Sequence, residues 1–291
     1  MAHEMTRSGG RATAVSVRCW QVSSSAEVGQ DGRLISSPGY RATRWYQAPA
    51  RSTAMAALLA NGRYPAVEYS TNLRDLVDAT DFEVPWWFRT VFTASPRDRT
   101  VLQADGVIPK ADLWVNGTMV AGSDVIAGAY TTNCFDVSSL VGEGLNVAAF
   151  LVHPGNPNTD LSIGWVDWNQ WPPDNNMGIW RDVWIRHTGA VSLAHLRVTS
   201  ELADDLASAS LEVSVDVTNR SESAVTALVS LAIAGPKAAE TVAPRETVSP
   251  RDTVAPRETV APQENDARQR TEAAQDADAQ QVELEPGETR R

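Results

Sequence analysis

The sequence predicts an all-β protein: an antiparallel β-sandwich of jelly-roll type, then a partial immunoglobulin-like β-sandwich, then a disordered tail. Short apolar runs alternate with turn residues from residue 19 to residue 189, as is typical of a sandwich built from short strands. A second series of runs with period-2 alternation begins after Gly189. Every aromatic residue lies at or before Trp184, so the two ends of the chain are expected to differ physically.

Residues 1–18 are predicted to be a disordered leader, and residues 19–189 to form the jelly-roll domain. The runs with strand-like composition in this domain are 81–93, 112–120, 129–137, 142–152 and 177–186. In the first of them, Pro85 marks an edge or a bulge. One short helix is predicted at 52–61, where Gly62 would act as the C-cap.

Two pairs of residues give sharper local predictions. Asn116 and Gly117 lie between two alternating runs, and both residue types accept the positive φ of a type I′ turn. The sequence therefore predicts a β-hairpin with these residues at its tip. Trp86 and Trp87 would point to opposite faces of a strand, so one of them is expected in the core.

Residues 190–235 are predicted to form the partial immunoglobulin-like domain. Such a sandwich needs about seven strands, and three runs are present before the composition changes. These runs are 191–199, 210–219 and 224–234.

A hexapeptide array characterises residues 236–280, which are predicted to be a Pro-rich linker. Its units are Glu240–Arg245, Glu246–Arg251, Asp252–Arg257 and Glu258–Gln263. Proline removes backbone donors and the units have little to bury, which favours an extended, solvated segment. A repeat solenoid is the alternative, although units this short lack any large apolar residue. Residues 281–291 hold one brief alternation and are a candidate strand remnant.

Composition excludes several classes of function. A net charge of −11 leaves no basic stripe for a nucleic-acid partner, and no run approaches the roughly 20 apolar residues that cross a membrane. The N-terminus lacks the apolar segment of a signal peptide, so the localisation is cytoplasmic by default. The four histidines show no metal-ligand spacing, and neither a metal nor a cofactor is expected. Cys19 and Cys134 could form one disulfide or remain two buried thiols.

The segment Gly164–Arg181 is the main candidate for function, because it combines four tryptophans with two aspartates and three asparagines. Indole faces attract the C–H groups of a sugar ring, while Asp and Asn supply directional hydrogen bonds. Pro172, Pro173 and Gly178 exclude a continuous helix or central strand, which predicts a shaped loop. Carbohydrate binding is one interpretation, and tryptophans that mostly fill the core are the other.

A set of motifs then resembles glycoside hydrolase family 2, in its exo-β-D-glucosaminidase (exo-chitosanase) and β-mannosidase-like branch. The resemblance covers roughly residues 20–235, and it rests on a combination of motifs rather than on one weak match. The motifs are Trp86–Arg89, Lys110–Gly117, Ala127–Thr131, Arg51–Thr53, Asn72-Leu73 and Met177–Val183.

The resemblance implies a modular enzyme, in which a galactose-binding-like jelly-roll and an immunoglobulin-like domain precede a catalytic (β/α)8 barrel. In the family, the barrel supplies two glutamates for retaining hydrolysis, an acid/base and a nucleophile. No region of this sequence resembles such a barrel, so no residue here corresponds to those glutamates. We therefore expect a chain that is inactive alone, such as the product of a split gene, whose barrel is separately encoded.

The resemblance also implies where a sugar would bind, because loops of the first domain help shape the subsite at the barrel mouth. Asp167 would hydrogen-bond a hydroxyl or the amine of a glucosamine or chitosan-type β-glycoside, beside an indole wall; its alternative role is to cap a local turn. The predicted substrate-binding residues are Asp167, Trp168, Trp165 and Asn169.

Three hypotheses follow from the sequence. The first is the N-terminal, subsite-shaping portion of a family 2 glycoside hydrolase without catalytic residues of its own. The second is an autonomous carbohydrate-binding module, for which the Pro-rich tail would be a flexible tether. The third is a purely structural β-sandwich.

Overall fold

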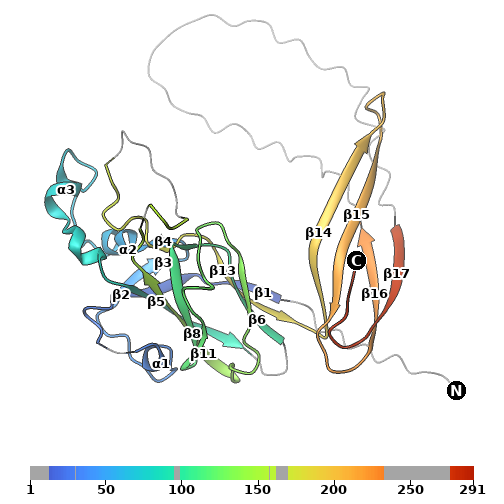
Figure 1. Cartoon of the computed structure of the whole chain (residues 1–291), viewed down its shortest axis with the longest axis horizontal. Helices are drawn as coiled ribbons and strands as arrows, with labels where there is room; N and C mark the ends of the chain where they lie inside the picture. The colour runs from blue at the N-terminus through green and yellow to red at the C-terminus, as the bar shows by residue number, and fades with distance from the viewer. Residues whose placement is uncertain (1–12, 30, 95–98, 157, 162–169, 233–275) are drawn as a thin grey trace, which may run out of the picture. The chain divides into compact units, whose positions relative to one another are not determined.

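The computed structural model describes residues 13–29, 31–94, 99–156, 158–161, 170–232 and 276–291 (Figure 1). The chain divides into two compact units, Met1–Ser192 and Leu193–Arg291. In the described part of the chain, no helix combines the length and the apolar character needed to cross a membrane.

The first unit is built almost entirely from antiparallel strands. They are β1 (Thr13–Ser16), β2 (Cys19–Ser24), β3 (Tyr46–Pro49), β4 (Ser52–Thr53), β5 (Trp86–Ala94), β6 (Arg99–Ala104), β7 (Val107–Ile108), β8 (Lys110–Val115), β9 (Thr118–Ala121), β10 (Asn133–Asp136), β11 (Gly144–His153), β12 (Gly178–Ile179) and β13 (Val183–Thr188). Its helices are α1 (Gly32–Ile35), α2 (Ala54–Ala60), α3 (Asn72–Leu76) and the 3-10 helix η1 (Ala79–Phe82). The sheet orders are β3-β2-β5-β11-β8-β9, β1-β13-β6-β10 and β4-β12-β7.

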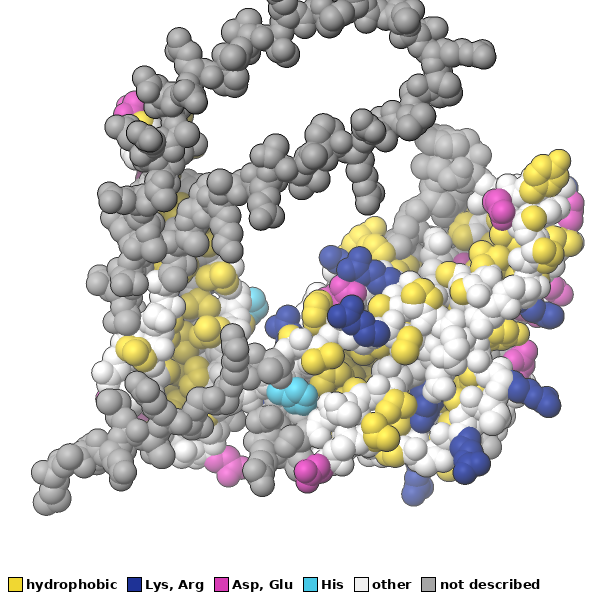
Figure 2. Space-filling view, turned by 180° about the vertical axis from the view of Figure 1, so that it is seen from behind, with side chains coloured by type: hydrophobic (Ala, Val, Ile, Leu, Met, Phe, Trp, Pro, Cys, Tyr) yellow, Lys and Arg dark blue, Asp and Glu magenta, His cyan; other side chains and the backbone are white. Residues whose placement is uncertain are grey.

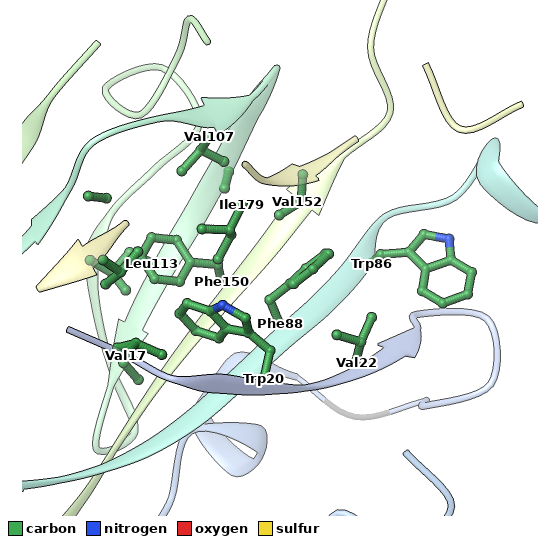
Figure 3. Packing of buried hydrophobic residues seen from close by; sticks show 14 of the residues in the cluster. Val17, Trp20, Val22, Trp86, Phe88, Val107, Leu113, Phe150, Val152 and Ile179 are labelled. Atoms are coloured by element: carbon green, nitrogen blue, oxygen red, sulfur yellow. The ribbon is translucent and has the colours of Figure 1, made fainter. Parts of the chain in front are cut away.

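Aromatic residues fill the space between the six-stranded and the four-stranded sheet. Trp20, Phe88 and Phe150, from β2, β5 and β11, are completely buried (Figure 3). The Trp20 ring meets the two phenyl rings edge to face, at centroid distances of 6.4 and 5.9 Å. Leu102 and Ile185 close this core from the four-stranded sheet. The packing of two antiparallel sheets around one core confirms the predicted all-β sandwich.

The outer face of the six-stranded sheet is covered as well. Trp87 packs there against Ile35, Trp45 and Ala149, while its neighbour Trp86 belongs to the main core. The two indoles therefore point to opposite faces, as predicted. Both are buried, because residues of α1 and of the segment that follows it cover the second face, whereas the sequence predicted only one of them in the core.

A buried guanidinium holds this covering segment in place. Arg89 lies on β5, and its side chain donates to the backbone oxygens of Ile35, Ser37 and Tyr40 and to the side chain of Gln21. Burial lowers the pKa of Arg89 from its ordinary value. Because the planar guanidinium offers five donors, one residue can bond several backbone carbonyls of this segment at once.

The predicted hairpin forms between β8 and β9. Asn116 and Gly117 occupy its tip with φ values of 47° and 87°, the signs that a type I′ turn requires. The side chain of Asn116 also accepts a hydrogen bond from the backbone of Val147 and donates one to Asn146. Asn146 is buried, and its own amide pairs with both backbone groups of Gly142. The hairpin tip is thus connected to the start of β11.

The helix predicted at 52–61 is α2, and it has a side-chain cap at its N-terminus and a backbone cap at its C-terminus. Thr53 accepts from the backbone of Ala56 at the N-terminus. At the C-terminus Gly62 has a φ of 70°, and the paired hydrogen bonds from Gly62 to Leu59 and from Arg63 to Leu58 form a Schellman motif.

Two predictions about strand positions are corrected. The predicted leader, residues 1–18, contains strand β1, which pairs with β13 from Thr13 onward. Pro85 marks neither an edge nor a bulge, because β5 begins after it and lies inside the sheet between β2 and β11. Proline is compatible with the position before a strand, where no ladder hydrogen bond is required.

The second unit contains two small antiparallel sheets, with strand orders β14-β15-β18 and β16-β17. Its strands are β14 (Val191–Leu202), β15 (Ala209–Asn219), β16 (Val225–Ala232), β17 (Asp276–Leu284) and β18 (Thr289–Arg290). Large apolar side chains such as Leu193, Leu196 and Leu228 are exposed, and Figure 2 shows hydrophobic side chains at the surface of this unit. This sparse burial fits a partial sandwich.

Strand β17 changes the interpretation of the hexapeptide array. The predicted linker reaches residue 280, but β17 begins at Asp276 and pairs with β16, so that Ala232 lies opposite Asp276. Residues 233–275, which lie outside the described residues, therefore connect the two ends of one antiparallel pair. The array thus lies between two paired strands, whereas the sequence predicted a linker up to residue 280 with only a strand remnant after it.

Replacing residues 233–275 by an Asn-Gly turn tests this topology. We expect the hydrogen-exchange protection of the β16 amides to be retained, because the replacement supplies the turn that a hairpin needs. A matched variant that deletes Asp276–Leu284 should lose that protection. Equal loss of protection in both variants would contradict the β16–β17 pairing.

Asn146→Ala should destabilise the first unit by about 2 kcal/mol, because the backbone groups of Gly142 and the side-chain amide of Asn116 lose a buried partner. The measurement is urea denaturation followed by near-ultraviolet circular dichroism. Asn133→Ala is the matched control, since that amide makes one long, exposed hydrogen bond and should change stability by less than about 0.5 kcal/mol.

Candidate functional site

A groove of about 650 Å³ lies in the first unit, at the end where β5 begins and β11 finishes. One wall is the segment that carries α3 and η1, and the other is residues 170–175. Pro154 and Gly155, which come directly after β11, also line it. The groove is therefore made by segments far apart in sequence that the β5–β11 pairing brings together.

Aromatic and apolar groups line both walls. Phe82 ends η1 and stacks on Trp86, at a centroid distance of 5.7 Å and an interplanar angle of 23°. Across the groove, Trp171 remains 46% exposed, and Pro173 lies beside it. An indole that keeps almost half of its surface in solvent beside a groove is available to the C–H face of a ligand.

The charged groups of the groove differ in their pairing. The guanidinium of Arg74 forms an ion pair with Asp75 at 3.0 Å. Hydrogen bonds from Thr71 and then from Arg74 lower the pKa of the Asp75 carboxyl. The Glu83 carboxylate has no ion pair or side-chain hydrogen bond with any residue that the structure describes. Among the described lining residues Glu83 is the one carboxylate, and its negative charge has no partner in an ion pair there, whereas the Arg74 charge is paired with Asp75.

The wall formed by Trp171 is shaped by two consecutive turns. Asn175 donates its backbone N–H to Pro172, and Met177 donates to the backbone oxygen of Asp174. Asn175 and Asn176 have φ values of 48° and 59°, which Asn tolerates better than most residues. The side-chain oxygen of Asn175 also accepts from the Trp171 indole. These two asparagines belong to the segment for which the sequence predicted carbohydrate binding, and the structure shows them as turn residues.

Asp174 faces away from the groove and is 3% exposed. One carboxylate oxygen accepts from the backbone of Met55 at 2.8 Å, in the first turn of α2, and the other accepts from Asn176 at 2.9 Å. Burial raises the pKa of the Asp174 carboxyl above its ordinary value of 3.8, while hydrogen bonds from Met55, Thr53 and Asn176 oppose the shift. Its burial excludes direct contact with a sugar.

The end of the loop joins a sheet, within the run 177–186 that the sequence predicts to be strand-like. Gly178 and Ile179 form β12, the middle strand between β4 and β7, although Gly178 was taken to exclude a central strand. A Cβ atom on Gly178 would lie 2.4 Å from the backbone oxygen of Ser52, so only glycine fits this close approach. Trp180 turns away to donate to the Ala129 carbonyl.

The four predicted substrate-binding residues, Asp167, Trp168, Trp165 and Asn169, lie outside the described residues. Of the tryptophan-rich segment, the structure places Trp171 in the groove. The opposite wall at residues 71–83 was missed, because neither α3 nor η1 carries a compositional signal for a ligand site.

Other expectations about chemistry can be compared with the described residues. Cys19 and Cys134 are both unbonded, and both are exposed, which contradicts the expectation of buried thiols. Within the ranges that the structure describes, no three His, Cys, Asp or Glu side chains are grouped so that they could hold a metal ion.

Comparison with known proteins assigns the first unit to a family. Residues 20–155 match the family described as glycosyl hydrolase 2 galactose-binding domain-like. The chain is 46% identical over 222 residues to an exo-β-D-glucosaminidase of Amycolatopsis orientalis, and 48% identical over 213 residues to one of Streptomyces avermitilis. These alignments cover 76% and 72% of this chain, but only 21% and 24% of the relatives.

The crystal structure of the Amycolatopsis orientalis exo-chitosanase is similar to this chain with a TM-score of 0.78 and 37% sequence identity. The match covers 96% of this chain and 28% of that enzyme. The chain thus spans about a quarter of the length of the relatives that it matches.

The raised pKa of Asp174 predicts a pH dependence of stability. The folded chain holds this proton up to a higher pH than the unfolded chain, so the carboxyl contributes stability below its ordinary pKa of 3.8. That contribution is lost as the pH rises through the folded pKa. Asp174→Asn removes the titration, so the free energy of unfolding of the wild type, minus that of the variant, should fall with rising pH.

Urea denaturation at a series of pH values between about pH 3 and pH 7 measures this difference. Asp75→Asn is the control, because the lowered pKa of Asp75 should make the corresponding difference rise with pH. A difference for Asp174 that also rises with pH would show that its folded pKa is not raised.

Proposed function

We propose that the groove binds a sugar unit of the substrate of exo-β-D-glucosaminidase-like enzymes, starting from the family of the chain. Residues 20–155 form a galactose-binding-like domain of glycosyl hydrolase family 2. The chain corresponds to the N-terminal portion of exo-β-D-glucosaminidase-like members of that family. The observation that carries the proposal is that one groove is lined by the exposed Trp171 indole and by the Glu83 carboxylate, which forms no ion pair with a described residue. A glucosamine unit has both complementary features, a C–H face and, when protonated, an ammonium group.

The groove is suited to binding and not to hydrolysis. A retaining glycosidase needs two carboxyl groups about 5–5.5 Å apart on either side of the scissile bond. Glu83 is the one carboxylate among the described lining residues, since Asp174 is buried behind the wall and Asp75 is paired with Arg74. The proposed role is therefore to hold and orient the sugar, while a (β/α)8 barrel outside these residues supplies the catalytic acids.

Asp167, Trp168, Trp165 and Asn169 belong to this proposal on the strength of the sequence alone. They directly precede the Trp171 wall in the chain, and their residue types suit a continuation of the same binding surface. A hydroxyl or amine bonded by Asp167 would add direction to the contact with the indole faces.

Autonomous carbohydrate binding is the second candidate, and one observation favours it. All the described residues that line the groove belong to the first unit, so a sugar could bind without any barrel. Isothermal titration of the chain with glucosamine oligomers separates the two candidates. Measurable binding by the chain alone supports the autonomous module, whereas binding that requires an added family 2 barrel supports the subsite-shaping role.

Substitutions in the groove test the proposed contacts. Trp171→Ala should lower the affinity for glucosamine oligomers about tenfold, because the aromatic contact contributes of order 1 kcal/mol or more. Glu83→Gln should lower it about fivefold for glucosamine oligomers and leave N-acetylglucosamine oligomers unaffected, because their amide nitrogen carries no charge. Titration calorimetry of both ligand series measures these effects.

Glu68→Gln is the matched control, since it removes the same charge from an exposed position that does not line the groove. The same loss of affinity in Glu68→Gln and Glu83→Gln would mean that the chain attracts cations only through its net charge. An unchanged affinity in Trp171→Ala would show that the groove is not the sugar-binding site.

A further inference from the structure

We propose that Asp174 is a positioning residue, which holds the Trp171 wall of the groove in its binding arrangement by anchoring it to the first turn of α2. The proposal rests on the sugar-binding function proposed for the groove. It assigns a role in affinity to a side chain that contacts no ligand.

Alternate residues of the wall face opposite ways. Trp171, Pro173 and Asn175 line the groove, whereas Asp174 points into the protein interior. The Asp174 carboxylate is thus a buried attachment of this short segment, and the backbone hydrogen bond from Ala54 to Met177 attaches the residues that follow it. Another attachment, from the Gln170 amide to the Ser70 carbonyl, is exposed to solvent.

A continuous set of hydrogen bonds connects the helix to the indole. The Met55 N–H donates to one carboxylate oxygen of Asp174, and the Asn176 N–H donates to the other. The backbone oxygen of Asp174 accepts from the Met177 N–H, and these bonds together fix the turn. That turn places Asn175, and the side-chain oxygen of Asn175 accepts from the Trp171 indole. A displacement of Asp174 is therefore transmitted to Trp171 through one intervening side chain.

Both carboxylate oxygens are used, which makes the position sensitive to a conservative change. Asp174→Asn keeps the size of the side chain but replaces one acceptor by an NH2 donor. That donor must face either the Met55 or the Asn176 N–H, and two donors repel. We expect the wall to shift away from α2 even where the domain stays folded.

The indole resonance of Trp171 in a ¹⁵N-labelled full chain measures the position of the wall without any ligand. It is assigned by its absence in Trp171→Phe. The resonance should shift or broaden in Asp174→Asn, and the affinity for a glucosamine oligomer should fall about fivefold or more. Asp174→Ser, a smaller residue that still caps well, is the second variant should Asp174→Asn not fold.

Asn61→Ala is the matched control, because Asn61 caps the other end of α2 through the Ala57 carbonyl and does not contact the wall. It should lower the thermal stability while leaving both the Trp171 resonance and the affinity unchanged. Equal changes of the Trp171 resonance in Asn61→Ala and Asp174→Asn would contradict the positioning role. Asp174 would then only stabilise α2.

The failure of this proposal and the failure of the groove function give different results. A Trp171 resonance that does not move in the folded Asp174 variants, while the wild type binds glucosamine oligomers, overturns the positioning role. The other outcome is a resonance that moves in these variants while neither the chain nor the chain with an added barrel binds the oligomer. That result would support the positioning of the wall by Asp174 and contradict the proposed sugar binding.

Discussion

Burial of both faces of strands β5 and β11 is the constraint on which the rest of the first unit depends. One face needs the aromatic core around Phe88 and Phe150, and the other needs the covering segment that Arg89 holds. Because the two strands are antiparallel, the start of β5 and the end of β11 meet at one edge of the sheet, with Trp86 opposite Val152. The groove forms at this edge, from the segment before β5 and the segments after β11.

Local chemistry in the sequence was sufficient to predict some of these elements. Asn116 and Gly117 specify a hairpin by their own backbone preferences, and α2 could be placed from its terminal glycine. The burial of both Trp86 and Trp87 could not be inferred in the same way, because it depends on a covering segment some fifty residues earlier. The far wall of the groove was missed for the same reason: it is created by tertiary pairing and has no motif of its own.

The tryptophan-rich loop shows how the same residue types can serve opposite purposes. Asp and Asn beside indoles suggested a set of sugar ligands, yet Asp174 is buried against a helix and Asn176 supports a left-handed turn. The carboxylate that does line the groove, Glu83, lies in the run 81–93, for which the sequence predicted a strand and no ligand. Composition can therefore identify a binding region, while the direction in which each side chain points needs the fold.

The pairing of Ala232 with Asp276 has a consequence for how the hexapeptide array can evolve. Since the two ends of the array are held together by a ladder, gaining or losing whole units leaves the register of β16 and β17 unchanged. Loop-closure entropy rises slowly with the length of a connection, by about 0.6 kcal/mol for each doubling. A change in the number of units is therefore compatible with the fold of the second unit, because the strands on either side of the array keep their partners.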